Sequence, residues 1–190
     1  VFSDADADAD VDADVDADAD ADTAEALDTG EASDTGTLPA ACERSEDIKI
    51  NEALVVPESS PDHQWVELYN RGSEPVNLSG WFLLAGETRP TLVDVGLDDV
   101  IIEPDGFVVV GGAADAAVDV AASLALGAAR EDADIIQLFD CADSVSDTLV
   151  YGSPNLDLWR DDSGEVADSL APAPSAGESI ARSPDGADSD

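Results

Sequence analysis

Basic residues are scarce in this chain. Its 190 residues include 7 lysines and arginines against 45 acidic residues, for a formal net charge of −38, and Lys49 is the single lysine. Nucleic-acid binding needs clustered Lys and Arg for the phosphates, and anionic membrane surfaces attract the same residues. The composition therefore disfavours both partners and leaves cations and neutral polymers. It is also typical of proteins adapted to a salty medium.

Methionine and long apolar runs are absent. Because no Met occurs even at position 1, we expect a processed or partial chain. No basic segment followed by an apolar run marks a signal peptide here, and no apolar stretch approaches the length of a membrane span. We therefore expect no membrane insertion in this chain, and a signal peptide lost upstream would lie outside it.

Cysteine and histidine are nearly as rare. Cys42 and Cys141 are the two cysteines and His63 the one histidine, too few for a structural zinc site. A Cys42–Cys141 disulfide fits better, and a loop of about 100 residues would contribute roughly 4–5 kcal/mol by chain entropy. It would indicate an exported protein. The alternative is two free thiols in a reducing cell.

Catalytic constellations are also missing. Nucleophilic hydrolysis needs a base and an orienting group, but His63 lies in the loop sequence SSPDH, where we expect a surface position. No phosphate-binding glycine loop with a lysine occurs, and Gly111-Gly112 is interpreted as a turn. Carboxylate pairs discriminate nothing among 45 acidic residues. We expect no enzyme and no cofactor.

The N-terminal segment is a low-complexity repeat in which an Asp occupies every second position from Asp4 to Asp22. A strand built this way would carry carboxylates along one whole face, and Ala offers too little apolar area to offset the cost of ordering. Residues 1–40 hold 14 acidic residues and no base, so 31 acidic and 7 basic residues remain in 41–190. We predict a disordered Asp/Ala-rich linker over 1–41 and one domain over 42–190.

The remainder of the chain shows repeated strand signals. Alternating or compact apolar runs bounded by Gly, Pro and Asp predict strands at 48–56, 64–70, 76–78, 81–85, 100–103, 107–110, 135–139, 145–151 and 178–183. The Ala-rich residues 113–129 are interpreted as a long loop with possible short helix. Many short strands in about 150 residues predict an all-β sandwich.

Several residues receive individual roles. The predicted structural core contains Trp65, Leu68, Trp81, Phe107, Ile136 and Leu138, although the alternation of Trp65 with Glu67 leaves an exposed platform open for that indole. In the turn Pro104–Gly106 we expect Gly106 to take the unusual φ. Asn70 should bond turn backbone, and Arg182 should form an ion pair with Asp185 or Glu67.

Acidic loops raise the question of calcium. Asp185, Asp188 and Asp190 stand at i, i+3 and i+5 on a Gly-containing loop, and Ca²⁺ prefers six to eight oxygen ligands from such loops. These three residues are the candidate metal ligands. The competing interpretation is a solvated, mutually repelling acidic surface with diffuse counterions.

The strand motifs resemble those of the lamin tail domain family. The resemblance lies in Ile50-Asn-Glu52, Trp65–Asn70, Val76–Trp81, Pro104–Gly111, Asp134–Leu138, Asp147 with Tyr151-Gly152, and Gly177–Asp188. It implies an immunoglobulin-like β-sandwich. In bacteria such domains are exported, often repeated, and appended to cell-surface proteins or secreted phosphoesterases and nucleases, where they are thought to bind or anchor.

The resulting functional hypothesis is a non-enzymatic, exported binding or scaffold module, displayed at the cell surface on the acidic linker. Its partner would be a protein or polysaccharide at that surface, with no nucleic acid. Two alternatives remain open. One is a targeting or anchoring appendage of a larger secreted hydrolase, and the other is a Ca²⁺-stabilised adhesion module.

Overall fold

The computed structural model describes residues 42–86, 93–112 and 118–188. The predicted linker over 1–41 lies outside the described residues, as does Asp190. The described part is all-β apart from one short 3₁₀ helix, η1 (Pro61–His63). Within it, no helix is long and apolar enough to cross a membrane.

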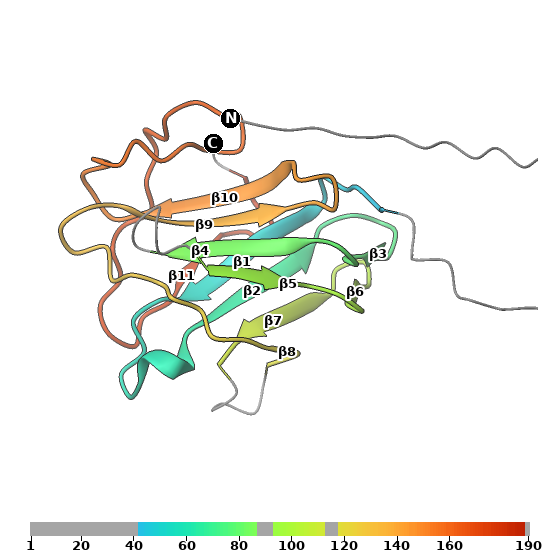
Figure 1. Cartoon of the computed structure of the whole chain (residues 1–190), viewed down its shortest axis with the longest axis horizontal. Coiled ribbons are helices and arrows are strands. Elements are labelled where there is room, and N and C mark those ends of the chain that lie inside the picture. The colour runs from blue at the N-terminus through green and yellow to red at the C-terminus, as the bar shows by residue number, and fades with distance from the viewer. Residues whose placement is uncertain (1–41, 87–92, 113–117, 189–190) are drawn as a thin grey trace, which may run out of the picture. The chain divides into compact units, whose positions relative to one another are not determined.

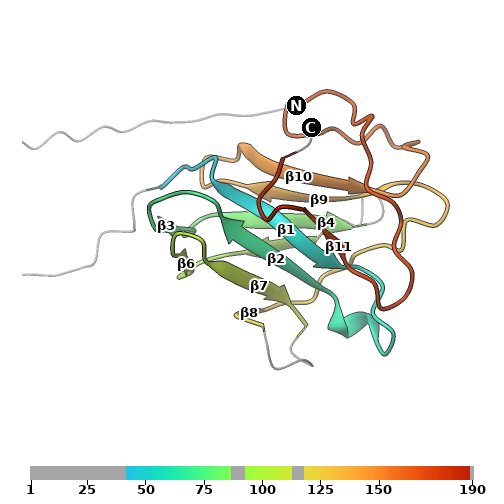
Figure 2. The same cartoon turned by 180° about the vertical axis from the view of Figure 1, so that it is seen from behind.

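Two sheets face each other in a β-sandwich, which confirms the predicted immunoglobulin-like fold class (Figure 1). The first sheet has the order β11-β1-β2-β7-β8 and is seen from its own side in Figure 2. The second has the order β10-β9-β4-β5, and β3 and β6 form a short separate pair. The strands are β1 (Ile48–Leu54), β2 (Trp65–Asn70), β3 (Val76–Asn77), β4 (Phe82–Gly86), β5 (Val93–Gly96), β6 (Ile101–Ile102), β7 (Phe107–Gly111), β8 (Val120–Ala121), β9 (Asp134–Phe139), β10 (Val145–Tyr151) and β11 (Ile180–Ala181).

The core lies between the two sheets and follows the period-two alternation of the strands. In β2 the inward residues Val66 and Leu68 are fully buried. Leu83, Ile136 and Leu138 face them from the second sheet, and Trp81 just before β4 is 1% exposed. Burial of such side chains stabilises the fold by about 1.5–3 kcal/mol each. The structure thus places Leu68, Trp81, Ile136 and Leu138 in the core.

The prediction that Trp65 and Phe107 belong to the core is wrong. Trp65 shares the outward face of β2 with Glu67 and Tyr69, and it is half-buried outside the core cluster. Phe107 is 44% exposed because Val108 and Val110 take the inward positions of β7. Its ring instead packs on Tyr69 across the strands, with centroids 4.7 Å apart.

Residues 118–129 contain a strand that the sequence reading missed. β8 pairs in parallel with β7, with Val110 opposite Val120, and no helix occurs among the described residues of this stretch. The interpretation as a loop with short helix is therefore corrected there, while 113–117 lie outside the described residues. β5 was also missed, since Val93–Gly96 offers only two valines separated by Asp94.

The turn before β7 corrects the expectation for Gly106. Asp105 takes the positive φ of 54°, and Gly106 is absent from the left-handed region. Gly106 meets a different demand, because a Cβ there would lie 2.7 Å from the carbonyl oxygen of Glu103. Glycine is therefore required by close backbone approach rather than by φ.

Beyond β10, the chain first packs against the second sheet through Trp159 and then returns to the first sheet. Residues 159–167 fold back as a small hairpin with Arg160 opposite Val166. Trp159 is 3% exposed and forms a second apolar cluster with Ile135, Val150 and Ala167 on the outer face of the second sheet. Its indole N–H donates to the Ala133 carbonyl at 2.8 Å. The chain then returns through β11 to pair with β1.

Candidate functional site

The N-terminal entry to the domain is clamped to the β9–β10 turn. A disulfide joins Cys42 to Cys141, which are 99 positions apart in sequence and have Cα atoms 5.5 Å apart. Next along the chain, the Trp81 indole donates to the Glu43 carbonyl at 2.7 Å, and Arg44 pairs with Asp140 at 2.6 Å. The first described residues are therefore fastened before β1 begins.

Strands β1 and β10, which belong to different sheets, each carry a bulge, and a hydrogen bond joins residues beside the two bulges. The β1–β2 register shifts between Ile50 and Glu52, so Asn51 is the bulged residue. The β10–β9 register shifts between Val145 and Asp147, which leaves Ser146 bulged. Bulges release backbone groups from the ladder and redirect side chains. Here they turn the fully buried carboxylate of Asp147 toward β1, where it accepts the Ile50 N–H at 2.7 Å.

Lys49 and Arg182 neutralise this carboxylate. The Lys49 ammonium lies 3.3 Å from Asp147 and 2.6 Å from Asp188, and its side chain is only 4% exposed. The Arg182 guanidinium lies 3.1 Å from Asp147. Asp162, at the tip of the hairpin, approaches Lys49 to 3.8 Å. We call Lys49, Asp147, Asp162, Arg182 and Asp188 the charge cluster.

The charge cluster perturbs two titrations. Burial raises the pKa of Asp147, and the charges of Arg182 and Lys49 with the Ile50 N–H reduce that rise without reversing it. For Lys49, burial alone would lower the pKa. The hydrogen bond to Asp188 and the charges of Asp147 and Asp188 outweigh it, so the pKa lies above its ordinary value. The ammonium is therefore held charged.

Arg182 and Asn51 hold the C-terminal segment. Arg182 does form the predicted ion pair, but its partners are Asp147 and Asp188, and the predicted partners Asp185 and Glu67 are wrong. Asn51 takes that place. Its amide nitrogen donates to Glu67 at 2.9 Å and Asp185 at 3.4 Å, and its amide oxygen accepts the Gly186 N–H at 2.9 Å.

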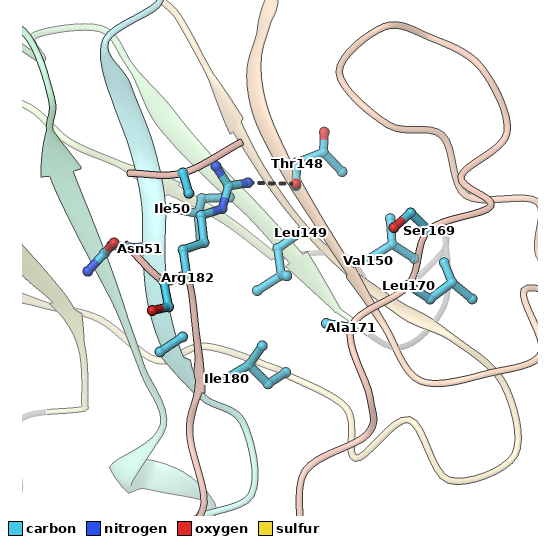
Figure 3. A pocket seen from close by; sticks show the side chains of 13 residues that line it. Ile50, Asn51, Thr148, Leu149, Val150, Ser169, Leu170, Ala171, Ile180 and Arg182 are labelled. Carbon is cyan, nitrogen blue, oxygen red and sulfur yellow. Dashed lines mark hydrogen bonds between the residues drawn. The ribbon is translucent and has the colours of Figure 1, made fainter. Parts of the chain in front are cut away.

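An open groove lies beside the charge cluster. Figure 3 shows Arg182 at one end of it and apolar side chains along its walls. We call it the edge groove. It encloses about 270 Å³ and is lined by residues of β1, β10, β11 and the stretch 169–171, including Thr148, Leu149, Leu170 and Ile180. Two β10 carbonyls that line the groove already have hydrogen-bond donors: the Val150 carbonyl accepts the Ala171 N–H, and the Thr148 carbonyl accepts from the Arg182 guanidinium.

The model of the Lamin Tail Domain family matches residues 43–153. The chain belongs to the lamin tail domain family. A search of curated proteins gave no match. The matched region runs from the clamped entry to the end of β10, so the hairpin with Trp159, β11 and Arg182 lie beyond it.

In this lamin tail domain the two described candidate metal ligands bond different partners. Asp188 is held by Lys49 and Asp185 by Asn51, while Asp190 is outside the described residues, so a calcium site there stays a prediction. Among described residues, one group of three carboxylates comes close enough to share an ion: Asp147, Asp162 and Asp188, with oxygens within 4.8 Å. The Lys49 ammonium contacts all three and occupies the position of a cation.

Three basic side chains of the lamin tail domain lie together and pair with carboxylates of the same domain. Arg44, Lys49 and Arg71 line a second hollow of about 560 Å³. Each of them has a carboxylate partner, since Arg71 lies 3.8 Å from Asp47 and the other two pair as described above. The described part of the domain therefore offers these three cations to its own carboxylates.

His63 lies in η1 of the lamin tail domain, half-buried, with its Nδ1 atom 2.6 Å from the Ser59 hydroxyl. Asn70, as predicted, bonds turn backbone: it donates to the carbonyls of Glu74 and Ile102 and accepts the Gly72 N–H. Sequence reasoning gave Lys49 no role in a site and placed Asp147 only within a family motif. The signal for Lys49 was available, because it is the only lysine and stands between two isoleucines of a strand.

Proposed function

We propose that the chain is a non-enzymatic binding or scaffold module, exported and displayed at the cell surface on its acidic linker. The lamin tail domain family, a non-catalytic immunoglobulin-like family often involved in binding or scaffolding, supports the coarse assignment. The proposed partner is a protein or polysaccharide of that surface. The net charge of −38 supports the exclusion of nucleic acid.

The observation that carries the proposal is the position of the Cys42–Cys141 disulfide. Cys42 lies where the predicted linker ends and the domain begins, and the disulfide joins this residue to Cys141 in the β9–β10 turn. Structural disulfides persist in oxidising compartments. A pull on the linker would reach the second sheet through this bond instead of peeling β1 from its neighbours. Such a clamp suits a module held on a tether.

Protease treatment of intact producing cells tests the proposal. A protease that cleaves after acidic residues should cut the predicted linker over 1–41, which is rich in Asp. This cleavage should release the disulfide-bonded domain into the medium. Mass spectrometry should find a fragment that begins within the linker and retains both cysteines. Release only after cell lysis would contradict display at the surface. Cleavage distributed through 42–190 would contradict the assignment of linker and domain.

A further inference from the structure

Exposed apolar side chains concentrate in one segment of the described chain. Among all the described residues, five large hydrophobic side chains are exposed to solvent. Three of the five lie between residues 155 and 167: Leu156 (66% exposed), Leu158 (58%) and Val166 (40%). This segment follows β10 as the orange loop of Figure 1 and lies outside the family-matched region. We call it the 155–167 loop. The three residues lie close together in sequence, and apolar residues that gather on a protein's surface mark interaction sites.

The loop is held firmly at several points. Asn155 donates to the carbonyls of Trp159 and Ala167 and accepts the Trp159 N–H at 2.8 Å. The Leu156 N–H donates to Asp132 at 2.7 Å. Trp159 is buried beneath the loop, and the tip carboxylate of Asp162 approaches Lys49. A surface that is already ordered loses little conformational freedom on binding.

Leu158 is an unfavourable choice for the free protein on two grounds. Its φ of 55° lies in the left-handed region, which disfavours residues with a Cβ and especially bulky ones. Its side chain is also 58% exposed to water. Gly or Asn would relieve the backbone and expose less apolar area. Local rules are broken in this way at functional sites, where a bound state supplies the compensation.

Charge identifies the kind of partner. The 155–167 loop carries Asp157, Asp161, Asp162 and Glu165 around the apolar residues. Its one base, Arg160, donates to the Gly164 carbonyl within the hairpin turn. A partner must therefore offer an apolar cleft with positive charge at its rim. A second copy of this acidic chain and an anionic membrane would both be repelled.

We propose that the 155–167 loop is a docking prong whose Leu156, Leu158 and Val166 side chains enter an apolar cleft rimmed by Lys and Arg on a partner protein. The proposal does not depend on where the module is displayed.

The test uses a synthetic amphipathic peptide of leucine and lysine as the probe. A peptide of equal charge with serine in place of leucine controls for attraction to the acidic surface in general. The full chain should bind the leucine peptide more tightly than the serine peptide. Leu156→Ser and Leu158→Gly should each weaken binding of the leucine peptide by about tenfold. Ile101→Ser, at a residue 57% exposed on β6, should leave it unchanged.

Leu158→Gly keeps the test independent of folding. Because glycine accepts the positive φ, this variant should resist urea at least as well as the unmodified chain while it loses affinity. Peptide-induced NMR shifts should centre on residues 155–167. Equal binding by all variants, or an equal loss in Ile101→Ser, would overturn the proposal. Self-association that Leu156→Ser abolishes would also overturn it, in favour of a second copy as the occupant.

Discussion

The buried Asp147 carboxylate of β10 accepts the backbone N–H of Ile50 in β1 at 2.7 Å. A side chain of one sheet thus completes the hydrogen bonding of the other at the point where both strands bulge. Lys49 and Arg182 make this arrangement tolerable, since an unpaired buried carboxylate would cost several kcal/mol. The charge cluster is therefore the polar joint of the sandwich.

Replacement of Asp147 should weaken the fold severely. Asp147→Ala leaves the Ile50 N–H without its acceptor and removes the buried one of the two carboxylates that Lys49 and Arg182 share, for an expected loss of about 3–5 kcal/mol in the free energy of unfolding. Asp147→Asn should lose less, because its amide oxygen keeps one acceptor. Urea unfolding measures both. Asp168→Ala, at an exposed carboxylate, serves as control and should change stability by less than about 0.5 kcal/mol. Equal stability of Asp147→Ala and the control would contradict the claim that Asp147 joins the two sheets.

Acid should loosen the N-terminal clamp through Asp140. Burial alone would raise the pKa of this carboxyl, but the N–H groups of Ser144 and Ala142 and the Arg44 guanidinium outweigh it and hold the pKa below its ordinary value. The stabilisation is therefore present above the ordinary Asp pKa and is lost as pH falls through the lower folded value.

Asp140→Asn retains an oxygen for the two turn N–H groups but loses the ion pair with Arg44. Because Arg44 is 62% exposed, solvent screens the pair, and we expect a loss of only about 1 kcal/mol at neutral pH. Unfolding titrations at several pH values should show the two proteins converge below pH 4 or so, as Asp140 protonates. A gap that stays constant across this range would show that the carboxylate charge plays no part.

Alkaline pH should act on Lys49 in the opposite sense. The pKa of Lys49 in the folded protein lies above its ordinary value. The charged ammonium therefore contributes fully to folding stability at pH values below the ordinary Lys pKa, and this stability is lost as pH rises through the folded pKa. Lys49→Gln should lower stability at neutral pH and remove this alkaline loss. Measured unfolding curves that fall equally in both proteins at high pH would assign the loss to another group.

Trp159 should fasten the C-terminal hairpin to the outer face of β9 and β10. Trp159→Ala removes the cover of Ile135 and Val150 and the bond to the Ala133 carbonyl, at an expected cost of about 3–5 kcal/mol. Limited proteolysis should then cut within residues 154–171 before the sandwich itself. Trp159→Phe keeps the apolar cover and should resist cleavage better. A variant Trp159→Ala that resists as well as the unmodified chain would contradict this role.

We expect the charge cluster not to bind calcium. The Lys49 ammonium already contacts the three clustered carboxylates of Asp147, Asp162 and Asp188. Calorimetric titration with CaCl₂ should therefore give no saturable heat from this group at millimolar concentrations. A saturable heat that disappears in Asp162→Asn would show that calcium displaces the ammonium. Heat that survives in Asp162→Asn would point to a site elsewhere in the chain.

The sequence predicted the sandwich because period-two alternation and turn residues are local signals. It placed Leu68 and Trp81 in the core correctly, and it failed at Phe107, where the parity of β7 turns the ring outward. The site was harder. Asp147 acts through Ile50 and Lys49, residues almost 100 positions away, and two bulges are needed to bring them together. No local pattern in the sequence encodes that meeting.

The redox state of Cys42 and Cys141 reports the compartment in which the module resides, because disulfides persist in oxidising compartments. Mass spectrometry of protein taken from its producing cells measures that state directly. Treatment with iodoacetamide before and after reduction should add two carbamidomethyl groups only after reduction, and the unreduced digest should contain a peptide that joins the two cysteines. Two alkylated cysteines without any reductant would contradict an exported, clamped module.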